Sequence, residues 1–461
     1  MSEQSYKGLA WVAAMALFMQ SLDATILNTA LPAIGQDLHV PAFEMQLAII
    51  AYSLAVALFI PLTAWAAEKF GTLSVFRTAV LTFVIGSIAC ACSSSVEMLV
   101  LSRVLQGLGG AFMMPVSRLA IIQNVPKNQL INAWNLMATA GLAGPIIGPI
   151  LGGWLVTYAS WHWIFLINIP IGVLGVVFSG RVMSNQRGIA AKLDWSGFLL
   201  FALGLVGLTL GLDLFSESRH DVNIAYVAFA LGVALMLGYY FYAKTHEKAI
   251  LPLSLFNTRT FRVGIMANML IRLSGSGVPF LLPLLFQLAL GYSAEASGWL
   301  LAPVALMSVI FKSVSEPILS RFGYKKSLIW SAILMGASIF AMGFLNKESS
   351  ITWIVLNLMW YGACMSMIFT AINTLSVGDL TNEQAGAGST VLSIVQQVGI
   401  GFGIAVSSII LTVSRHLVGE QGEQLQRAFS YTFFCSVIFA LLLVWVLSKL
   451  HSNDGEQLHK K

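Results

Sequence analysis

The sequence predicts an all-α polytopic membrane protein, and three observations support this prediction. The 461 residues are 57% hydrophobic and only 10% charged, and their mean hydropathy is +0.81. A chain with so few polar side chains cannot cover the surface of a soluble globule. Apolar runs long enough for a membrane-spanning helix, which takes about 20 residues, recur along the whole chain. Lysines and arginines gather in alternate connections between these runs.

Fourteen apolar segments have the length of a membrane-spanning helix. The connections between them are short, so we expect no extramembrane domain. The first segment passes directly into a polar turn without a small-residue cleavage site, and it is expected to remain as a membrane anchor. The expected spans cover residues 9–32, 44–66, 75–93, 97–122, 132–157, 163–181, 195–215, 223–243, 262–289, 295–318, 327–345, 351–373, 387–411 and 429–448.

The basic residues set the expected orientation of these spans. If the N-terminus is cytoplasmic, eighteen of the 25 lysines and arginines fall on the cytoplasmic side, four on the opposite side and three within spans. Cytoplasmic loops of membrane proteins are enriched in lysine and arginine. We therefore expect both termini in the cytoplasm.

A short internal repeat indicates two related halves. Residues 68–72 (EKFGT) follow the second expected span, and residues 320–324 (SRFGY) follow the tenth, 252 positions later. This offset matches span 1 with span 9 and leaves spans 7 and 8 as an insert, the plan of membrane carriers built from parallel repeats. The expected domains are a six-helix bundle over 1–181, a two-helix insert with its linkers over 182–260, and a second six-helix bundle with a short cytoplasmic tail over 261–461.

Composition and motifs exclude several functional classes. The net charge of +5 comes from basic residues scattered through short loops, which does not indicate nucleic-acid binding. The four cysteines lie in apolar runs without metal-ligand or secretory spacing. The sequence holds neither a catalytic constellation nor a nucleotide-binding Walker pattern. We therefore expect no enzyme activity, no cofactor, no metal and no nucleic-acid partner.

The first expected span carries an acid, Asp23, in its interior. A carboxylate inside a membrane is costly unless it is paired, hydrated or protonated, so such a residue indicates a functional site. Arg103 lies near the start of the fourth span, and at about 1.5 Å rise per residue both side chains are expected roughly 9 to 14 Å below the outer surface. We therefore expect an Asp–Arg contact, either direct or through Gln20 or Gln106.

Two interpretations of this pair remain open. It is either a static ion pair that fixes helix packing or a proton-coupling site, in which protonation of Asp23 weakens the pair and releases the helices to move. A nearby cation favours the charged carboxylate, whereas desolvation favours the neutral acid. A proton fits the sequence better than sodium, because Asp23 is its one deep carboxylate. Glu316 is expected to pair with Lys312, four residues before it on the same helix.

Small residues and prolines mark one face of the fifth expected span. Small residues let a neighbouring backbone approach closely, while prolines remove backbone donors and bend a helix. Ordinary packing explains single pairs of such residues, but seven in thirteen positions predict a bent helix packed tightly against a neighbour. The seven residues are Gly141, Gly144, Pro145, Gly148, Pro149, Gly152 and Gly153.

The two repeated turns are expected to form a gate at the cytoplasmic side. Gly71 suits a left-handed backbone position, and Glu68 and Lys69 are placed to contact the ends of neighbouring helices. Arg321 and Gly323 occupy the corresponding turn of the second half.

Arg272 stands about ten residues into the ninth span, near the membrane midplane, and no acid lies at helical spacing from it. Asn268 is its polar neighbour four residues away, and the offset of 252 aligns Arg272 with Gln20. An unpaired guanidinium at that depth is costly, and its planar donors match a carboxylate. We hypothesise a substrate cavity lined by Gln20, Gln106, Asn268 and Arg272. The solute is then anionic or zwitterionic, such as an organic acid or its metal complex.

Four stretches of the chain carry a resemblance to a known family. Residues 22–32 (LDATILNTALP) resemble its first-helix signature, and residues 103–110 (RVLQGLGG) its fourth-helix basic motif. Residues 144–149 (GPIIGP) resemble its fifth-helix antiporter motif, and residues 161–172 (WHWIFLINIPIG) the start of its sixth helix. Over essentially its whole length, the chain resembles the fourteen-span drug:proton antiporters of the major facilitator superfamily, closest to the MdtD-type multidrug resistance transporters.

The resemblance implies a major facilitator fold with two six-helix bundles plus two inserted helices. It also implies that Arg103 takes part in proton transfer and that the bent fifth helix favours export over uptake. The stretch of residues 64–71, at the end of the second expected span, departs from the family's loop motif. Ala64 stands where the family has a leading glycine, Glu68 where it has Asp and Lys69 where it has Arg. A weaker lock is therefore expected at this loop.

From the residues and the resemblance together, we expect a secondary active carrier that exchanges a cytoplasmic solute for external protons by alternating access. Its expected partners are the lipid bilayer, a small-molecule substrate and protons, and its expected state is a monomer. Two alternatives remain open. Proton-coupled uptake or facilitated diffusion differs from export in the direction of proton-driven flux. A non-transporting membrane sensor or assembly protein would move no solute in liposomes.

Overall fold

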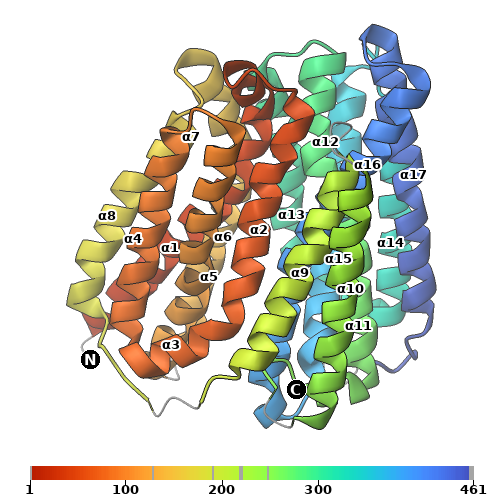
Figure 1. Ribbon diagram of the computed structural model, residues 1–461. Helices are drawn as coiled ribbons and strands as arrows, with labels where there is room; N and C mark the ends of the chain where they lie inside the picture. The colour runs from red at the N-terminus through yellow and green to blue at the C-terminus, as the bar shows by residue number, and fades with distance from the viewer. Residues whose placement is uncertain (1–2, 127–128, 189–191, 217–221, 247–248, 456–461) are drawn as a thin grey trace. The chain divides into compact units, whose positions relative to one another are not determined.

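The computed structural model describes residues 3–126, 129–188, 192–216, 222–246 and 249–455 (Figure 1). Five of the basic residues used above to orient the chain lie outside these ranges: Lys127, Arg219, Lys248, Lys460 and Lys461. Within the described ranges the chain is helical and contains no β-strand.

The α-helices follow one another with short connections. Their bounds are α1 Glu3–Asp37, α2 Gln46–Phe59, α3 Thr63–Phe70, α4 Thr72–Ala91, α5 Val96–Asn124, α6 Leu130–Tyr158, α7 Trp163–Leu166, α8 Asn168–Val182, α9 Trp195–Ser216, α10 Val222–Thr245, α11 Arg259–Gly275, α12 Val278–Leu284, α13 Ala294–Phe322, α14 Tyr324–Met342, α15 Ile351–Gly378, α16 Asn382–Val418 and α17 Gly422–Ser448.

Fourteen helical segments among the described residues are long and apolar enough to cross a membrane, which confirms the fourteen expected spans. Three of these segments contain more than one helix. The second joins α2 to α3 through a 3₁₀ turn, Ile60–Leu62, where Pro61 cannot donate a backbone hydrogen bond. The sixth joins α7 to α8. The ninth joins α11 to α12 and ends in a π-helical turn, Leu285–Ala289.

The first span is longer than the sequence pattern predicts. We expected it to end near Pro32, but α1 continues through this proline to Asp37. A proline within a helix removes only one backbone donor, and in membrane proteins the neighbouring groups satisfy the freed carbonyl. Pro32 therefore does not end the helix.

The chain divides into two compact units, Met1–Leu193 and Asp194–Lys461. In the first unit, α1 packs against α6 and α8, and α5 packs against α1, α2 and α4. The second unit holds the pair α9 and α10 together with α11 to α17, and α9 packs on α16. The division into two six-helix bundles and an insert remains a prediction.

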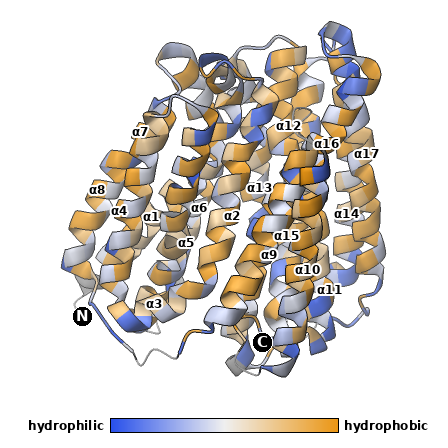
Figure 2. Ribbon diagram, in the orientation of Figure 1, coloured by the Kyte–Doolittle hydropathy of each residue, from blue (hydrophilic) through white to orange (hydrophobic). Residues whose placement is uncertain are grey.

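Hydrophobic side chains lie on the outside of the helices as well as between them. Trp11, Leu101, Trp330 and Leu441 are each more than half exposed. Figure 2 shows hydrophobic residues along the middle of the helices and hydrophilic residues mainly near their ends. This distribution matches a bilayer that solvates the sides of the helices and water that solvates their ends. The protein is a multi-pass membrane protein.

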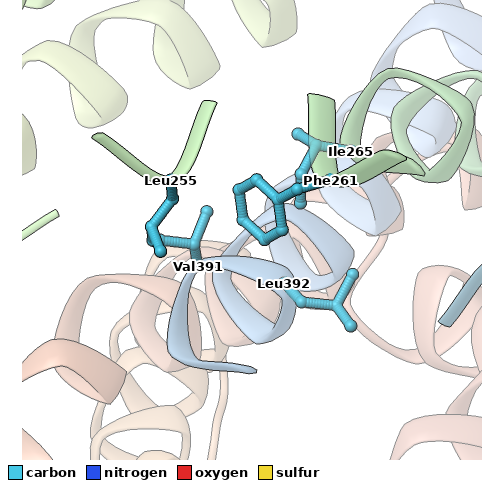
Figure 3. Packing of buried hydrophobic residues seen from close by; sticks show 5 residues of the cluster. All are labelled: Leu255, Phe261, Ile265, Val391 and Leu392. Carbon is cyan, nitrogen blue, oxygen red and sulfur yellow. The ribbon is translucent and has the colours of Figure 1, made fainter. Parts of the chain in front are cut away.

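A buried hydrophobic cluster joins α11 to α16 at the N-terminal ends of both helices (Figure 3). Phe261 and Ile265 of α11 meet Val391 and Leu392 of α16, and Leu255 of the preceding 3₁₀ turn completes the cluster. These side chains fix the register of the two helices. That register positions Arg272, further along α11, against α16.

Candidate functional site

A buried ion pair joins two helices of the first unit. Asp23 lies on α1 and Arg103 on α5, and each side chain is only 1% exposed. Nη1 of Arg103 donates a hydrogen bond of 2.6 Å to Oδ2 of Asp23. The direct contact expected from their depths in the membrane is therefore present in the structure.

Gln106 links the two charged groups a second time. Its amide oxygen accepts a hydrogen bond of 2.6 Å from Nη1 of Arg103, and its Nε2 donates to Oδ1 of Asp23 at 2.7 Å and to Ser87 Oγ at 2.9 Å. Both carboxylate oxygens are thus hydrogen-bonded. We assigned Gln106 to the substrate cavity, but in the structure it is fully buried within the ion-pair network.

Further residues that we did not predict complete the network. Asn168 of α8 donates from Nδ2 to Oδ1 of Asp23 at 3.3 Å, and Nε of Arg103 donates to the carbonyl of Ala48 at 3.1 Å. The ring of Tyr52 lies 4.4 Å from Cζ of Arg103. Asn168 falls within the stretch that resembles the family's sixth helix, and this is the one signal by which the sequence marks it.

The network can respond to a proton in a defined way. With both groups charged, the pair is neutral overall, and its hydrogen bonds offset the cost of burial. Protonation of Asp23 removes the negative charge and leaves the guanidinium buried without a counterion. Removing one partner of a buried ion pair is strongly unfavourable, so uptake of a proton favours a rearrangement of α1 and α5.

Gln20 lies about one turn before Asp23 on α1 but does not bond to the charged pair. Its Nε2 donates to the carbonyl of Gly110 on α5 at 3.3 Å, and its amide oxygen is buried without a hydrogen bond among the described residues. Gln20 therefore joins α1 to α5 next to the ion pair.

The glycine face of α6 packs against α1, the helix that carries Asp23. A Cβ atom added at Gly144 would lie 2.7 Å from the backbone nitrogen of Leu22, and one added at Gly152 would lie 2.6 Å from the carbonyl oxygen of Ile26. Gly141 and Gly148 face α1 in the same way, against Leu17 and against Thr25 with Ile26. The expected close approach of a neighbouring backbone is present.

The other residues singled out on this helix do not interrupt it. Pro145 and Pro149 both lie inside the continuous helix α6. Gly153 is buried, and its carbonyl accepts a hydrogen bond of 2.8 Å from Thr157. The hydroxyl of Thr25 reaches across to the carbonyl of Gly144 at 3.4 Å. The interface is thus closed by backbone and small side chains.

The turn between α3 and α4 is held by the segment that follows α8. Gly71 adopts a φ of +94°, as expected for a left-handed position, and its neighbour Thr72 donates from its backbone to the carbonyl of Gln186 at 3.1 Å. The backbone carbonyl of Glu68 accepts from Gly188 at 3.0 Å, and Lys69 lies 4.7 Å from the ring of Trp65. Backbone groups thus join this turn to the segment after α8, and among the described residues the side chains of Glu68 and Lys69 make no hydrogen bond there.

The turn between α13 and α14 repeats this geometry in the second unit. Gly323 has a φ of +76°, and the Arg321 guanidinium lies over the Phe322 ring, as Lys69 does over aromatic rings in the first unit. The segment after the last helix packs nearby, where Arg259 pairs with Asp454 at 2.5 Å. The two turns, 252 positions apart, therefore have the same backbone form, which supports the internal repeat.

Arg272 lies in the last turn of α11. Its Cζ is 4.9 Å from the centre of the Phe369 ring, and its Nε is buried without a hydrogen bond among the described residues. Asn268 lies one turn earlier, where it donates to the carbonyl of Gly264 at 3.1 Å and does not contact Arg272 through a hydrogen bond. Arg272 and Asn268 belong to the second unit, and Gln20 and Gln106 to the first.

One further prediction concerns the charged side chains of Lys312 and Glu316 on α13. Lys312 and Glu316 are both exposed, and within the described part of the chain they form no ion pair, so this prediction was wrong. Spacing at i and i+4 alone contributes only a few tenths of a kcal/mol, which is too little to hold two exposed side chains together. Among the described residues, no three His, Cys, Asp or Glu side chains are grouped to hold a metal ion.

Comparisons with known proteins identify the family. The model of the Major Facilitator Superfamily matches residues 13–403, with a second match over residues 264–460. The "Probable transport protein HsrA" of Haemophilus influenzae is 70% identical over 99% of this chain and 98% of its own length. The "Putative multidrug resistance protein MdtD" of Serratia proteamaculans is 36% identical over 94% of this chain and 91% of its own length.

A solved structure shares the fold at low sequence identity. The crystal structure of a D-xylose-proton symporter covers 97% of this chain and 98% of its own, with a TM-score of 0.72 and 14% identity. The family match, the similarity to named transport proteins and the fourteen spanning helices agree with one another. The chain belongs to the Major Facilitator Superfamily and is a membrane transporter rather than an enzyme.

Proposed function

We propose that this protein exports small molecules from the cytoplasm in exchange for external protons. The observation that carries the proposal is the buried network of Asp23, Arg103 and Gln106. The proposed site of action is the cell inner membrane, with both termini in the cytoplasm and the protein working as a monomer.

The network suits proton coupling because Asp23, its one acid, bonds directly to Arg103 on α5, the helix that must respond to the proton. Asp23 takes up or releases the proton, and the charge on Arg103 converts that event into a change in the attraction between α1 and α5. Gln106 is a neutral link that bonds to both groups. Intramembrane acids and arginines of this kind mark proton relays in many transporters.

The packing of α1 against α6 supports a mechanical role for the same helix. Because the glycines of α6 leave room only for the side chains of α1 and bring the two backbones close, displacement of α1 is transmitted directly to α6. The proton site and the glycine interface therefore act on one pair of helices.

The direction of transport is proposed from the relatives. Several similar proteins carry the name multidrug resistance protein, which implies efflux by those proteins. We extend that direction to this chain. The first alternative is uptake driven by the same proton gradient.

The test is transport in proteoliposomes with an imposed pH gradient. Proteoliposomes in which the cytoplasmic face of the protein points outward, with an acidic lumen, mimic the exporting cell. The expected result is accumulation of labelled solute in the lumen together with loss of lumenal protons. A cationic dye and small labelled carboxylates serve as solutes, and protein-free liposomes as the control. Solute movement down the pH gradient together with protons contradicts antiport. If no solute moves in either direction, the transport proposal fails.

A further inference from the structure

Arg272 is a charged side chain inside a membrane-spanning segment without a counterion among the described residues. None of those residues forms an ion pair with it or accepts a hydrogen bond from it. Helices α11 and α15 contain no Asp or Glu, and the one acid of α16, Glu383, precedes Gly399 by sixteen positions. In the internal repeat, the position that corresponds to Asp23 is Gly275, so the repeat supplies no acid near Arg272 either.

The backbone around Arg272 is that of an interrupted helix. Helix α11 ends at Gly275, and the chain starts again as α12 at Val278 within the same span. The carbonyl end of a helix favours a cation, but this effect is much smaller than the cost of an unpaired charge within a membrane. Interrupted helices form the binding sites of many secondary transporters.

The side chain of Arg272 is held in place by its neighbours. A Cβ added at Gly399 of α16 would lie 2.8 Å from Cβ of Arg272, so the aliphatic stem fits against a bare backbone. The Phe369 ring covers the guanidinium at 4.9 Å. Both Arg272 and Phe369 keep partial exposure. The guanidinium is therefore held in a fixed position, and its Nε is buried without an acceptor among the described residues.

A pair of amides lies one turn away on the two helices that contact Arg272. Gln396 precedes Gly399 on α16, Asn373 follows Phe369 on α15, and Gln396 Nε2 donates to Asn373 Oδ1 at 3.0 Å. Both amides are partly exposed. Each retains hydrogen-bonding capacity, because an amide offers two donors and an acceptor with two lone pairs.

We propose that Arg272 binds a carboxylate of the transported solute and that the Gln396–Asn373 pair binds a second polar group of the same molecule. One helical turn is about 5 Å, which sets the separation of the two groups. A single guanidinium matches a monoanionic carboxylate in charge and in its planar, bidentate geometry. The substrate class is small carboxylic acids with a hydroxyl or amino group, rather than lipophilic cations. That the bound solute is also transported rests on the proposed function.

The binding test uses purified protein in detergent and a set of labelled four-carbon compounds. Butyrate tests the carboxylate, butyramide lacks the charge, and 2-, 3- and 4-hydroxybutyrate move the hydroxyl stepwise away from the carboxylate. Native protein is expected to bind the acids, to discriminate against butyramide and to prefer 4-hydroxybutyrate. Arg272→Gln is expected to weaken acid binding by roughly 10- to 100-fold, the range for hydrogen bonds to a charged group.

Matched variants separate recognition from a structural effect. Arg272→Lys keeps the charge but loses the bidentate fork, so its affinity is expected between those of native protein and Arg272→Gln. Arg262→Gln makes the same substitution at an exposed position of α11 and is expected to leave binding unchanged. Gln396→Ala is expected to abolish the preference among the hydroxybutyrates while butyrate still binds.

The outcomes distinguish this inference from the proposed function. Failure of native protein to bind any of the acids, or equal binding by native protein and Arg272→Gln, overturns the inference. Proton-driven dye export that ignores Arg272, with no acid bound, also overturns it while the proposed function stands. Acid binding that depends on Arg272, without any proton-driven movement in proteoliposomes, supports the inference and contradicts the proposed function.

Discussion

The two units of this protein hold arginines in their membrane-spanning helices under opposite conditions. In the first unit, Arg103 is fully buried and bonds to Asp23, Gln106 and the carbonyl of Ala48. In the second unit, Arg272 stacks on Phe369 and has no hydrogen-bond acceptor among the described residues. We propose that this difference lets one repeated scaffold serve two purposes. In this proposal the ion pair holds a conformation that protonation of Asp23 releases, and the unpaired guanidinium of Arg272 binds a ligand.

The two units also differ in what the glycines of one helix face on the neighbouring helix. In the first unit, four glycines of α6 face α1 and close the interface. In the second unit, α16 presents Gly399 and Gly403 to α11, and both face Arg272. We propose that the first interface transmits movement and that the second positions Arg272 for binding.

The largest expected effect is that of Asp23→Asn on coupling. The amide cannot gain or lose the charge on which the membrane potential acts, at about 2.3 kcal/mol per 100 mV. We expect proton-driven solute accumulation in proteoliposomes to disappear while solute binding is retained. Asp37→Asn, at an exposed position of the same helix, should accumulate solute like native protein. Full accumulation by Asp23→Asn would show that Asp23 is not the proton site.

The next expected effect is loss of transport in Gly148→Leu. The new Cβ would contact the hydroxyl of Thr25 and lie 3.2 Å from the backbone nitrogen of Ile26, so α1 and α6 must separate. Gly175→Leu places the same side chain where a Cβ meets nothing within 4 Å. Transport rates in proteoliposomes should fall to background for the first variant only. Equal rates in both variants would show that the glycine interface is not required for movement.

Removal of the two arginines should affect stability with different magnitude and sign. Arg103→Gln leaves a buried carboxylate without its cation, and breaking such a pair costs about 3 to 5 kcal/mol. Arg272→Gln removes an unpaired charge, so its thermal unfolding temperature in detergent should stay the same or rise. If Arg272→Gln unfolds at a temperature as low as Arg103→Gln does, a counterion for Arg272 must exist within the protein.

The smallest expected effect compares the two left-handed turns. A residue with a Cβ at such positive φ costs about 1 to 3 kcal/mol, so both Gly71→Ala and Gly323→Ala should be destabilised. Gly71→Ala should be the worse, because its Cβ also meets the side-chain amide of Asn185, whereas at Gly323 the nearest atom is the Ser452 carbonyl at 4.0 Å. Thermal unfolding measures the difference. A greater loss for Gly323→Ala would mean that the C-terminal segment supports its turn more tightly than these contacts imply.

The sequence revealed those features that a membrane makes costly. Asp23 and Arg103 are conspicuous because charges are rare within spans, and their depths were enough to predict their contact. Asn168, Ser87 and Tyr52 could not be predicted in the same way, because uncharged polar residues in spans have many roles. The end of α1 was misplaced at Pro32, since a proline ends a soluble helix more reliably than a membrane helix. The pair of Lys312 and Glu316 failed because spacing alone does not bring exposed side chains together.

The ion pair joins residues that are 80 positions apart in the chain, and this separation has a consequence for synthesis. At roughly 5 to 20 residues per second, Arg103 is made about 4 to 16 s after Asp23. During that interval α1 is complete while its carboxylate has no arginine. The nascent helix must therefore carry Asp23 in protonated form, or keep it against water or the insertion machinery, until α5 is synthesised.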